Sequence, residues 1–213
     1  GEAFVATYMV APSAVVDGLA AFSVAFEDLA GNVGATVETS TDASEVTVDT
    51  TAPTLSSVSI TSSNDVDATR ANVGDVITLT IVSSEAIVPP TVHIGGLAVD
   101  VSSADDSALN YTAAYTIHDA KEVSEGSVGV SVAYEDVVGN TGATAVQTSD
   151  GSIVVIDTTA PTLTRVTATS SNAADTTRAG TGDTITVSIT ASEPVVMPRV
   201  DIAGQGHEAV SVA

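Results

Sequence analysis

Residues 24–36 read VAFEDLAGNVGAT and residues 132–144 read VAYEDVVGNTGAT, so one stretch of sequence returns after 108 residues. Two more pairs of segments match at the same offset: VDTTAPTL at 48–55 with IDTTAPTL at 156–163, and GDVITLTIVSSE at 74–85 with GDTITVSITASE at 182–193. Matches in a single register indicate an internal repeat in which each copy forms one structural unit.

The repeat period divides the chain into three parts. Residues 50–157 form one complete repeat, residues 1–49 are the C-terminal half of a preceding repeat, and residues 158–213 are the N-terminal half of a following one. Since Gly1 is not an initiator Met and opens no signal peptide, we expect a window cut from a longer repeat protein. The alternative is that the tail of one copy completes the head of the next by strand complementation.

Acidic side chains supply almost all of the charge. The chain has 27 Asp or Glu residues and 5 Lys or Arg residues, which gives a formal net charge of −22. Such a field repels nucleic acid and anionic membrane surfaces and attracts divalent cations. Hydrophobic residues make up 44% of the chain, which predicts a folded core, and no apolar run is long enough for membrane insertion. The absence of cysteine excludes disulfides and thiolate chemistry.

Alternating hydrophobicity predicts β-strands throughout the repeat, and helical periodicity is not evident. Ile77, Leu79 and Ile81 alternate with threonines, and their repeat mates at 185, 187 and 189 alternate with a threonine and a serine, so one face of this strand is core and the other is wet. The complete repeat holds seven candidate strands, at 54–61, 75–82, 91–94, 97–101, 109–118, 127–134 and 143–157, with the last one broken near 149–151. The pattern predicts an all-β fold of antiparallel sandwiches of about 100 residues each.

The repeated motifs carry a resemblance that covers the whole chain. The DTTAPT joint, the GD-x-[IV]-T-[LV] strand, the SSE or ASE turn and the ED-x-x-GN loop resemble the bacterial Ig-like and cadherin-like tandem repeats of large extracellular adhesins and matrix or filament proteins. The resemblance implies tandem immunoglobulin-like β-sandwiches at a cell surface. The disulfide and core Trp of antibody domains are absent, so it implies the architecture and not an immune-type receptor.

Acidic residues gather at one predicted end of each sandwich. In a seven-strand sandwich, the loop after the second strand and the loop before the seventh lie where the chain enters. Oxygen ligands there suit calcium, which takes six to eight of them. In the complete repeat the candidates are Asp49, Glu85, Glu135, Asp136 and Asn140, and the equivalent positions in the partial repeats are Glu27, Asp28, Asn32, Asp157 and Glu193.

The same loop has a simpler interpretation that stays open. Asp and Asn in a D-x-x-G-N sequence favour tight turns through local hydrogen bonds, and Gly139 can supply a positive φ. The motif therefore predicts either a calcium site assembled from separate loops or a plain turn.

The joint between repeats is predicted to be short and stiff. Pro53 and Pro161 fix their own φ and restrict the preceding residue to extended conformations. If calcium joins the loop to the joint, its removal should loosen the connection and lower the melting temperature.

No catalytic constellation is evident in the sequence. His93 aligns with Asp201 at the repeat offset, and no serine lies in a G-x-S-x-G motif. We expect that the chain is not an enzyme but a structural or adhesive repeat segment, extracellular or on a cell surface. Its expected partners are neighbouring repeats of the same protein, and self-assembly into a filament stays open. The alternative is a carbohydrate- or surface-binding β-sandwich, although the few aromatic residues fall mainly on predicted core rows.

Overall fold

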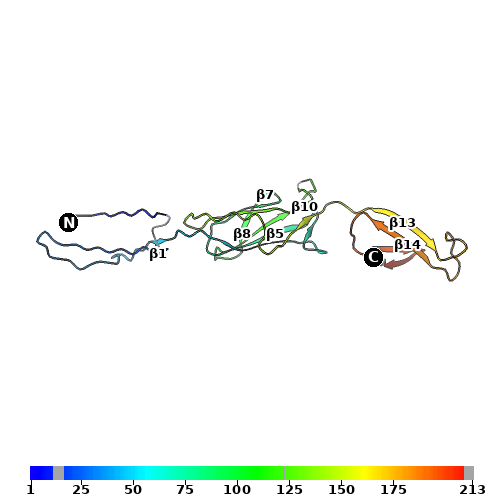
Figure 1. Cartoon of the computed structure of the whole chain (residues 1–213), viewed down its shortest axis with the longest axis horizontal. Coiled ribbons are helices and arrows are strands. Elements are labelled where there is room, and N and C mark those ends of the chain that lie inside the picture. The colour runs from blue at the N-terminus through cyan, green and yellow to red at the C-terminus, as the bar shows by residue number, and fades with distance from the viewer. Residues whose placement is uncertain (12–16, 122, 209–213) are drawn as a thin grey trace. The chain divides into compact units, whose positions relative to one another are not determined.

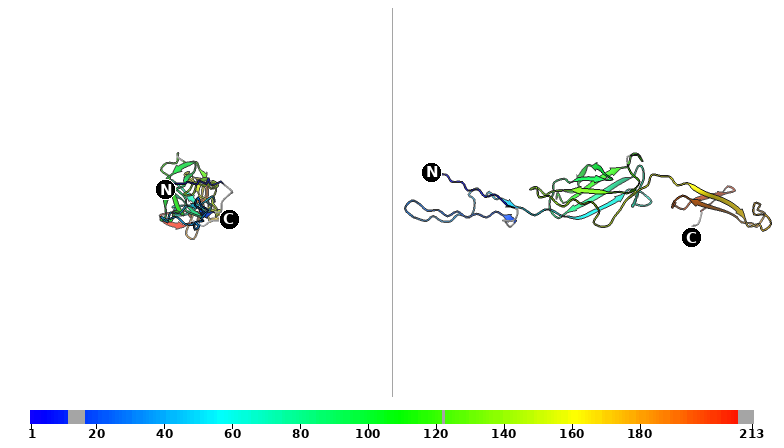
Figure 2. Two further views of the ribbon diagram at one scale, coloured as in Figure 1. Left: turned by 90° about the vertical axis from the view of Figure 1, so that its left-hand side faces the viewer. Right: turned by 45° about the horizontal axis from the view of Figure 1, so that its top comes forward.

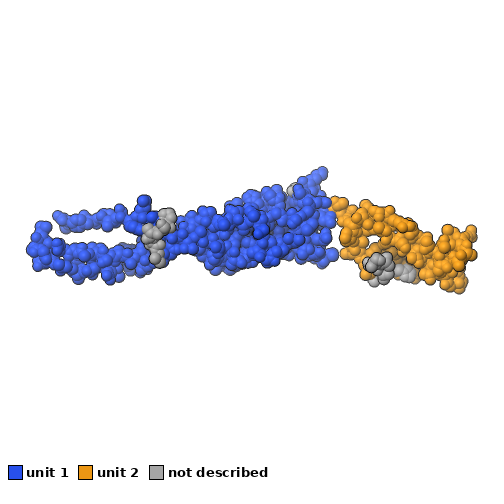
Figure 3. Space-filling model, in the orientation of Figure 1, with its two compact units in different colours: residues 1–158 blue, residues 159–213 orange. Residues whose placement is uncertain are grey.

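The computed structural model describes residues 1–11, 17–121 and 123–208. Within these ranges the secondary structure is all-β, and no helix occurs (Figure 1). The chain divides into two compact units, Gly1–Thr158 and Thr159–Ala213 (Figure 3). We call residues 50–157 the central unit, residues 1–49 the N-terminal half unit and Thr159–Ala213 the C-terminal half unit. The predicted repeat boundary between residues 49 and 50 stays a prediction.

The larger sheet of the central unit follows from the alternating segments. It joins β3 (Leu55–Ser62), β5 (Val76–Ser83), β9 (Asn110–Thr116) and β8 (Val101–Ser103), in that spatial order and with antiparallel pairing throughout. Side chains of β5 alternate strictly between buried and half-buried. One face of the sheet therefore belongs to the core, as the periodicity predicts.

A second antiparallel sheet faces the same core. It joins β11 (Val130–Ala133), β6 (Thr91–Ile94) and β7 (Leu97–Val99). Gly95 and Gly96, with φ of 60° and 83°, make the two-residue turn between β6 and β7, which is the backbone that such a hairpin requires. The predicted strand 97–101 is wrong as a single element, because the chain passes from one sheet to the other at Asp100.

A small third sheet closes one end of the central unit. It contains β10 (Gly126–Ser127), β12 (Val155–Ile156) and β4 (Arg70–Ala71), and the β12–β4 pair is parallel. The predicted strand 127–134 is therefore two elements, β10 and β11. The predicted strand 143–157 is broken as expected, with β12 at its end and an isolated bridge from Ala145 to Val132.

One apolar core joins the three sheets of the central unit. Ile77, Leu79 and Ile81 of β5 have no exposed area, and they pack in one cluster with residues of β6, β9, β11 and β12. Small branched side chains with two tyrosines, Tyr111 and Tyr134, fill the space between the sheets. The sheets of the central unit are arranged in a sandwich-like way (Figure 2). All residues of the core cluster belong to the central unit.

The outer edge of β3 is covered by two serines. Ser149 accepts a hydrogen bond from the N–H of Val58 at 2.9 Å, and its own N–H donates to the carbonyl of Val58 at 2.8 Å. Ser152 accepts from the N–H of Ile60 at 2.8 Å. Two otherwise open N–H groups of an edge strand are thereby satisfied.

The N-terminal half unit contains local pairing but little buried surface. β1 (Gly18–Leu19) pairs with β2 (Thr47–Val48), and isolated bridges join residues 24 to 37 and 27 to 33. Each of these contacts repeats, 108 residues earlier, a contact of the central unit. Residues 1–11 run separately from the loop formed by residues 20–48 (Figures 1 and 3).

The C-terminal half unit contains two antiparallel hairpins. β13 (Leu163–Ser170) pairs with β14 (Ile185–Ala191) in the register of β3 and β5, including the same irregularity near the start. β15 (Arg199–Ile202) pairs with β16 (Gln205–Glu208). In the described ranges, no helix has the length and hydropathy of a membrane span.

Candidate metal site

Three carboxylates from three separate segments meet at one end of the central unit. Asp49 follows β2 in the joint, Glu85 follows β5, and Asp136 follows β11. One oxygen of each lies within 4.8 Å of the other two. In the part of the chain that the structure describes, this is the one group of three or more acidic, His or Cys side chains close enough to share a metal ion. The three segments that the sequence predicts to converge therefore do lie together.

Asp136 is the buried member of the group and organises its own loop. Its side chain is 1% exposed, and Oδ1 accepts hydrogen bonds from the N–H groups of Val138, Gly139 and Asn140 at 2.9, 2.7 and 2.8 Å. Burial opposes the charge, but the hydrogen bonds from Asn140 and the loop outweigh it and hold the pKa of Asp136 below its ordinary value. Asp136 is therefore charged at neutral pH.

Asn140 connects the loop to the joint. Its Nδ2 donates to Oδ2 of Asp136 at 2.7 Å and to the backbone carbonyl of Asp49 at 3.2 Å. Gly139 has a φ of 97°, the left-handed backbone that the tight turn needs. The local hydrogen bonds predicted for the D-x-x-G-N turn are therefore present. They hold Asp136 beside the joint, and Asn140 positions this carboxylate through its amide nitrogen.

Glu85 is the member of the group in the least favourable electrostatic environment. Burial, followed by the like charges of Asp49, Asp136 and Asp17, raises the pKa of Glu85 above its ordinary value. Three half-buried or buried carboxylates with no basic side chain among the causes of this shift create a strongly negative point. A cation placed there would relieve the repulsion.

The spacing of the group fits a calcium ion. Two oxygens that each bind calcium at 2.3–2.6 Å lie at most about 5 Å apart, and the three carboxylate oxygens satisfy this limit. All three ligands are hard oxygens without imidazole or thiolate, a set that suits calcium or magnesium better than zinc or copper. Asp49, Glu85 and Asp136 could thus hold the ion, with water completing its coordination.

Glu135 lies outside this group although it precedes Asp136 in sequence. Its side chain is exposed, and its backbone pairs with Thr141 and accepts a hydrogen bond from the N–H of Val88 at 3.1 Å. The alternation of side chains along a strand directs Glu135 and Asp136 to opposite faces. A role for Glu135 as a ligand stays a prediction.

The other candidate residues form no second group of three carboxylates in the part of the chain that the structure describes, although the loop around Asp28 has the same turn. Asp28 accepts from the N–H of Asn32 at 2.8 Å and from its Nδ2 at 2.6 Å, which reproduces the turn around Asp136, and Glu27 is exposed like Glu135. Asp157, the last residue of the central unit, forms an ion pair with Arg70 at 3.8 Å, and Glu193 is half-buried in the C-terminal half unit. Metal binding by these residues stays a prediction.

Asp17 is a site residue that the sequence reasoning missed. Its Oδ1 accepts from the N–H and the hydroxyl of Thr50 at 2.8 and 2.7 Å, and its Oδ2 accepts from the hydroxyl of Thr51. These hydrogen bonds lower the pKa of Asp17. Glu125 occupies the same repeat position and accepts from the N–H and hydroxyl of Thr158 at 3.2 and 2.9 Å. The presence of an acidic residue at both repeat positions is the sequence signal that could have identified Asp17.

No protein-family model, curated protein or solved structure matches the chain. Its function is therefore inferred from its own residues and their arrangement.

Proposed function

We propose that the chain is a structural or adhesive segment of a long extracellular surface or filament protein, built from tandem immunoglobulin-like β-sandwich repeats and stiffened by calcium where repeats join. One observation carries the proposal. Asp49 belongs to the joint, whereas Glu85 and Asp136 belong to the unit that follows it, and their oxygens lie within 4.8 Å of one another. An ion bound by all three would fasten the joint to that unit.

The hydrogen bonds of the joint support a load-transmitting connection. On one side, Asp17 accepts hydrogen bonds from Thr50 and Thr51. On the other, the N–H of Thr54 donates to the hydroxyl of Ser84 at 3.0 Å. Pro53 between them is fully buried, and its ring fixes φ. A joint anchored on both sides transmits force instead of acting as a free hinge.

The second joint repeats hydrogen bonds on both of its sides, although Pro161, the counterpart of Pro53, is exposed. Glu125 takes the place of Asp17, and the N–H of Thr162 donates to the hydroxyl of Ser192 at 2.9 Å. In both joints a threonine donates hydrogen bonds to an acidic side chain before the proline, and another threonine N–H donates to a serine hydroxyl after it. This hydrogen bonding is therefore a property of the repeat. This regularity suits a protein whose role is to extend over many copies.

The burial of aromatic residues favours this role over carbohydrate binding. Sugar-binding surfaces commonly present aromatic rings to solvent, but Tyr111 and Tyr134 of the central unit are 3% and 7% exposed. Specific binding of the protein on a glycan array would favour the alternative of a carbohydrate-binding module.

Calorimetry of the full chain with calcium and with a chelator tests the metal proposal. At about 1 mM calcium, a site with the affinity of extracellular modules, a Kd of about 0.1–1 mM, should raise the melting temperature of the central unit by about 2–6 °C. Glu85→Gln should abolish this increment. The same substitution should raise the metal-free melting temperature, because it removes one of the mutually repelling charges.

Asp106→Asn is the matched control, since it removes an exposed acidic charge of the central unit at a residue outside the group. It should keep the calcium increment. Coincident wild-type traces with and without chelator would refute the metal site.

A further inference from the structure

The N-terminal half unit exposes a row of side chains that the central unit buries. Phe22, Val24 and Phe26 are 45%, 50% and 55% exposed, whereas the residues 108 positions later are 8%, 0% and 7% exposed. These later residues are Val130, Val132 and Tyr134 of β11 and its extension. The row has the sequence of a core face, but within the described ranges it has no second sheet to pack against.

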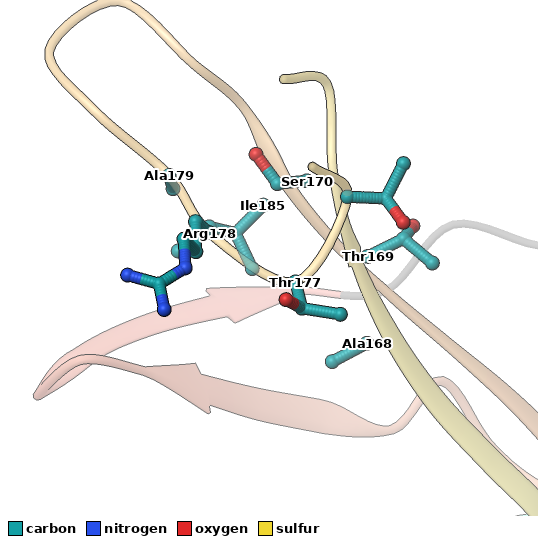
Figure 4. A pocket seen from close by; sticks show the side chains of 8 residues that line it. Ala168, Thr169, Ser170, Thr177, Arg178, Ala179 and Ile185 are labelled. Carbon is teal, nitrogen blue, oxygen red and sulfur yellow. The ribbon is translucent and has the colours of Figure 1, made fainter. Parts of the chain in front are cut away.

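The C-terminal half unit exposes the opposite side of the same core. Ile185 of β14 is 44% exposed and Val166 of β13 is 57% exposed, whereas their repeat mates Ile77 and Val58 are 0% and 2% exposed. A hollow of about 160 Å³ lies against this side, lined in part by Ala168, Thr177 and Ile185 (Figure 4). The apolar residues of its lining are Ala168, Ala179 and Ile185. Their repeat mates in the central unit, Ile60, Ala71 and Ile77, all belong to the core.

The central unit identifies what covers each of these surfaces. There β5 pairs with β9, β6 pairs with β11, and β4 pairs with β12. β5, β6 and β4 have their counterparts in the C-terminal half unit, at β14, β15 and residues 178–179. The N-terminal half unit holds the corresponding segments: residues 4–10 correspond to residues 111–117, which include most of β9, residues 22–25 correspond to β11, and β2 corresponds to β12. The two half units thus hold the two sides of one core.

The spacing of residues 4–10 fixes the register of the first strand. FVATYMV matches YTAAYTI at 111–117 in an aromatic-x-Ala-x-Tyr-x-aliphatic pattern, at an offset of 107. Because Leu79 is opposite Ala113 in the β5–β9 pair, the match places Ala6 opposite Val187. A slip by one residue would turn Phe4 and Tyr8 away from the core.

We propose that the N-terminal half unit of one copy docks on the C-terminal half unit of a second copy and completes a sandwich with the strand pairing of the central unit. Residues 4–10 add to the free edge of β14, residues 22–25 add to β15, and Val46, which is 67% exposed, covers the hollow that Figure 4 shows. Val154, its repeat mate, is fully buried beside β12.

This contact joins unlike surfaces, so it repeats head to tail and builds linear assemblies in solutions of the 213-residue chain. The docking goes beyond the proposed structural role and does not depend on it, because apolar burial and strand pairing drive it. Each copy carries a net charge of −22, so added salt should strengthen the association by screening repulsion between copies.

Cross-linking between two single-cysteine chains tests the docking and its register together. The protein has no cysteine, so Ala6→Cys and Val187→Cys each introduce one thiol, and opposed residues of an antiparallel pair lie within disulfide range. Mixed and mildly oxidised, the two chains should give a disulfide-linked heterodimer with both peptides identified by mass spectrometry. Val5→Cys mixed with Val187→Cys should give at least about tenfold less, because a one-residue slip reverses the strand's faces.

Sedimentation provides a measurement that does not depend on thiols. The wild-type chain should form assemblies whose size increases with concentration, and Val187→Asp should weaken them at least about 100-fold, since it buries an unpaired charge. Ser188→Asp, on the other face of β14, is the matched control and should weaken them less than about tenfold, because its carboxylate stays in water. The melting of the central unit should stay unchanged in both variants, which shows that this unit folds in each, and the retained association of Ser188→Asp shows that β14 tolerates a new carboxylate.

Two results would overturn the docking: a wild-type chain that stays monomeric at about 100 µM, well above the range of specific association, or preferential cross-linking of Val5→Cys. Neither result would affect the calcium increment of the central unit. Loss of that increment, conversely, would leave the cross-link intact, so the failures of the two proposals can be told apart.

Discussion

Ile77 and Ile185 are the same residue at the same repeat position in two different environments. Both lie at the start of the second long strand and are opposite a serine of the first, Ser62 and Ser170 respectively. Ile77 has no exposed area, whereas Ile185 is 44% exposed. Replacing each by alanine in the full chain compares a closed core with an open one, with identical chemistry removed.

The expected effects differ because only one site leaves a cavity. Ile77→Ala removes three buried carbons and leaves a cavity inside the central unit, which should lower the free energy of unfolding by about 2–5 kcal/mol. For a unit of about 100 residues, this corresponds to a decrease in melting temperature of about 10–20 °C. Ile185→Ala removes carbons that are already partly in water and leaves no closed cavity, so it should cost about 1 kcal/mol or less.

Differential scanning calorimetry of dilute protein measures both variants on the melting transition of the central unit. Ile77→Ala should shift this transition, and Ile185→Ala should leave it in place. At high protein concentration, Ile185→Ala should instead weaken the association between copies. Equal shifts for the two variants would refute the conclusion that residues 50–157 close their own core.

Two further predictions concern the charge and the packing of the central unit. In the metal-free protein, the raised pKa of Glu85 means that protonation of this side chain stabilises the folded state. The free energy of unfolding should therefore fall as pH rises from about 4.5 through the folded-state pKa. Thermal melts across this pH range should show the fall, and Glu85→Gln should remove it. Gly142→Ala would drive a Cβ into the buried ring of Tyr134 and should lower the free energy of unfolding by about 1–3 kcal/mol through overpacking. Gly34→Ala, whose Cβ would meet the exposed ring of Phe26, should lower it less in the same denaturant titration. Equal losses for the two variants would contradict the packing.

Hydrophobic alternation was sufficient to predict most strands but not how they are divided between sheets. The predicted strands at 75–82 and 91–94 differ from β5 and β6 by at most one residue at either end. The segment 97–101 is continuous in its alternation, yet the chain changes sheets at Asp100. Local sequence reports which face is apolar, whereas the change of sheet depends on which distant strand offers a free edge. β4, with only two residues, is too short to produce a period.

The topology of the repeat was sufficient to predict which loops form the candidate site, but not the hydrogen bonds within it. The alternation of strand direction is sufficient to bring the loops of Glu85 and Asp136 to the joint. The spacing of the loop does not reveal that the Asn140 amide faces Asp49 as a donor, because this depends on the turn closing around Asp136. Asp17 was missed because its position in sequence, 33 residues before Thr50, gives no indication of their contact.

The serines along β3 have a consequence for how such a chain avoids misfolding. Near-identical β-units tethered in one polypeptide meet at high local concentration, where an open strand edge can pair with the wrong neighbour and start aggregation. Ser149 and Ser152 occupy the N–H groups of Val58 and Ile60 from within the same unit. Sideways recruitment of another chain at this edge must first displace them, so two small hydroxyl groups protect the central unit from its neighbours.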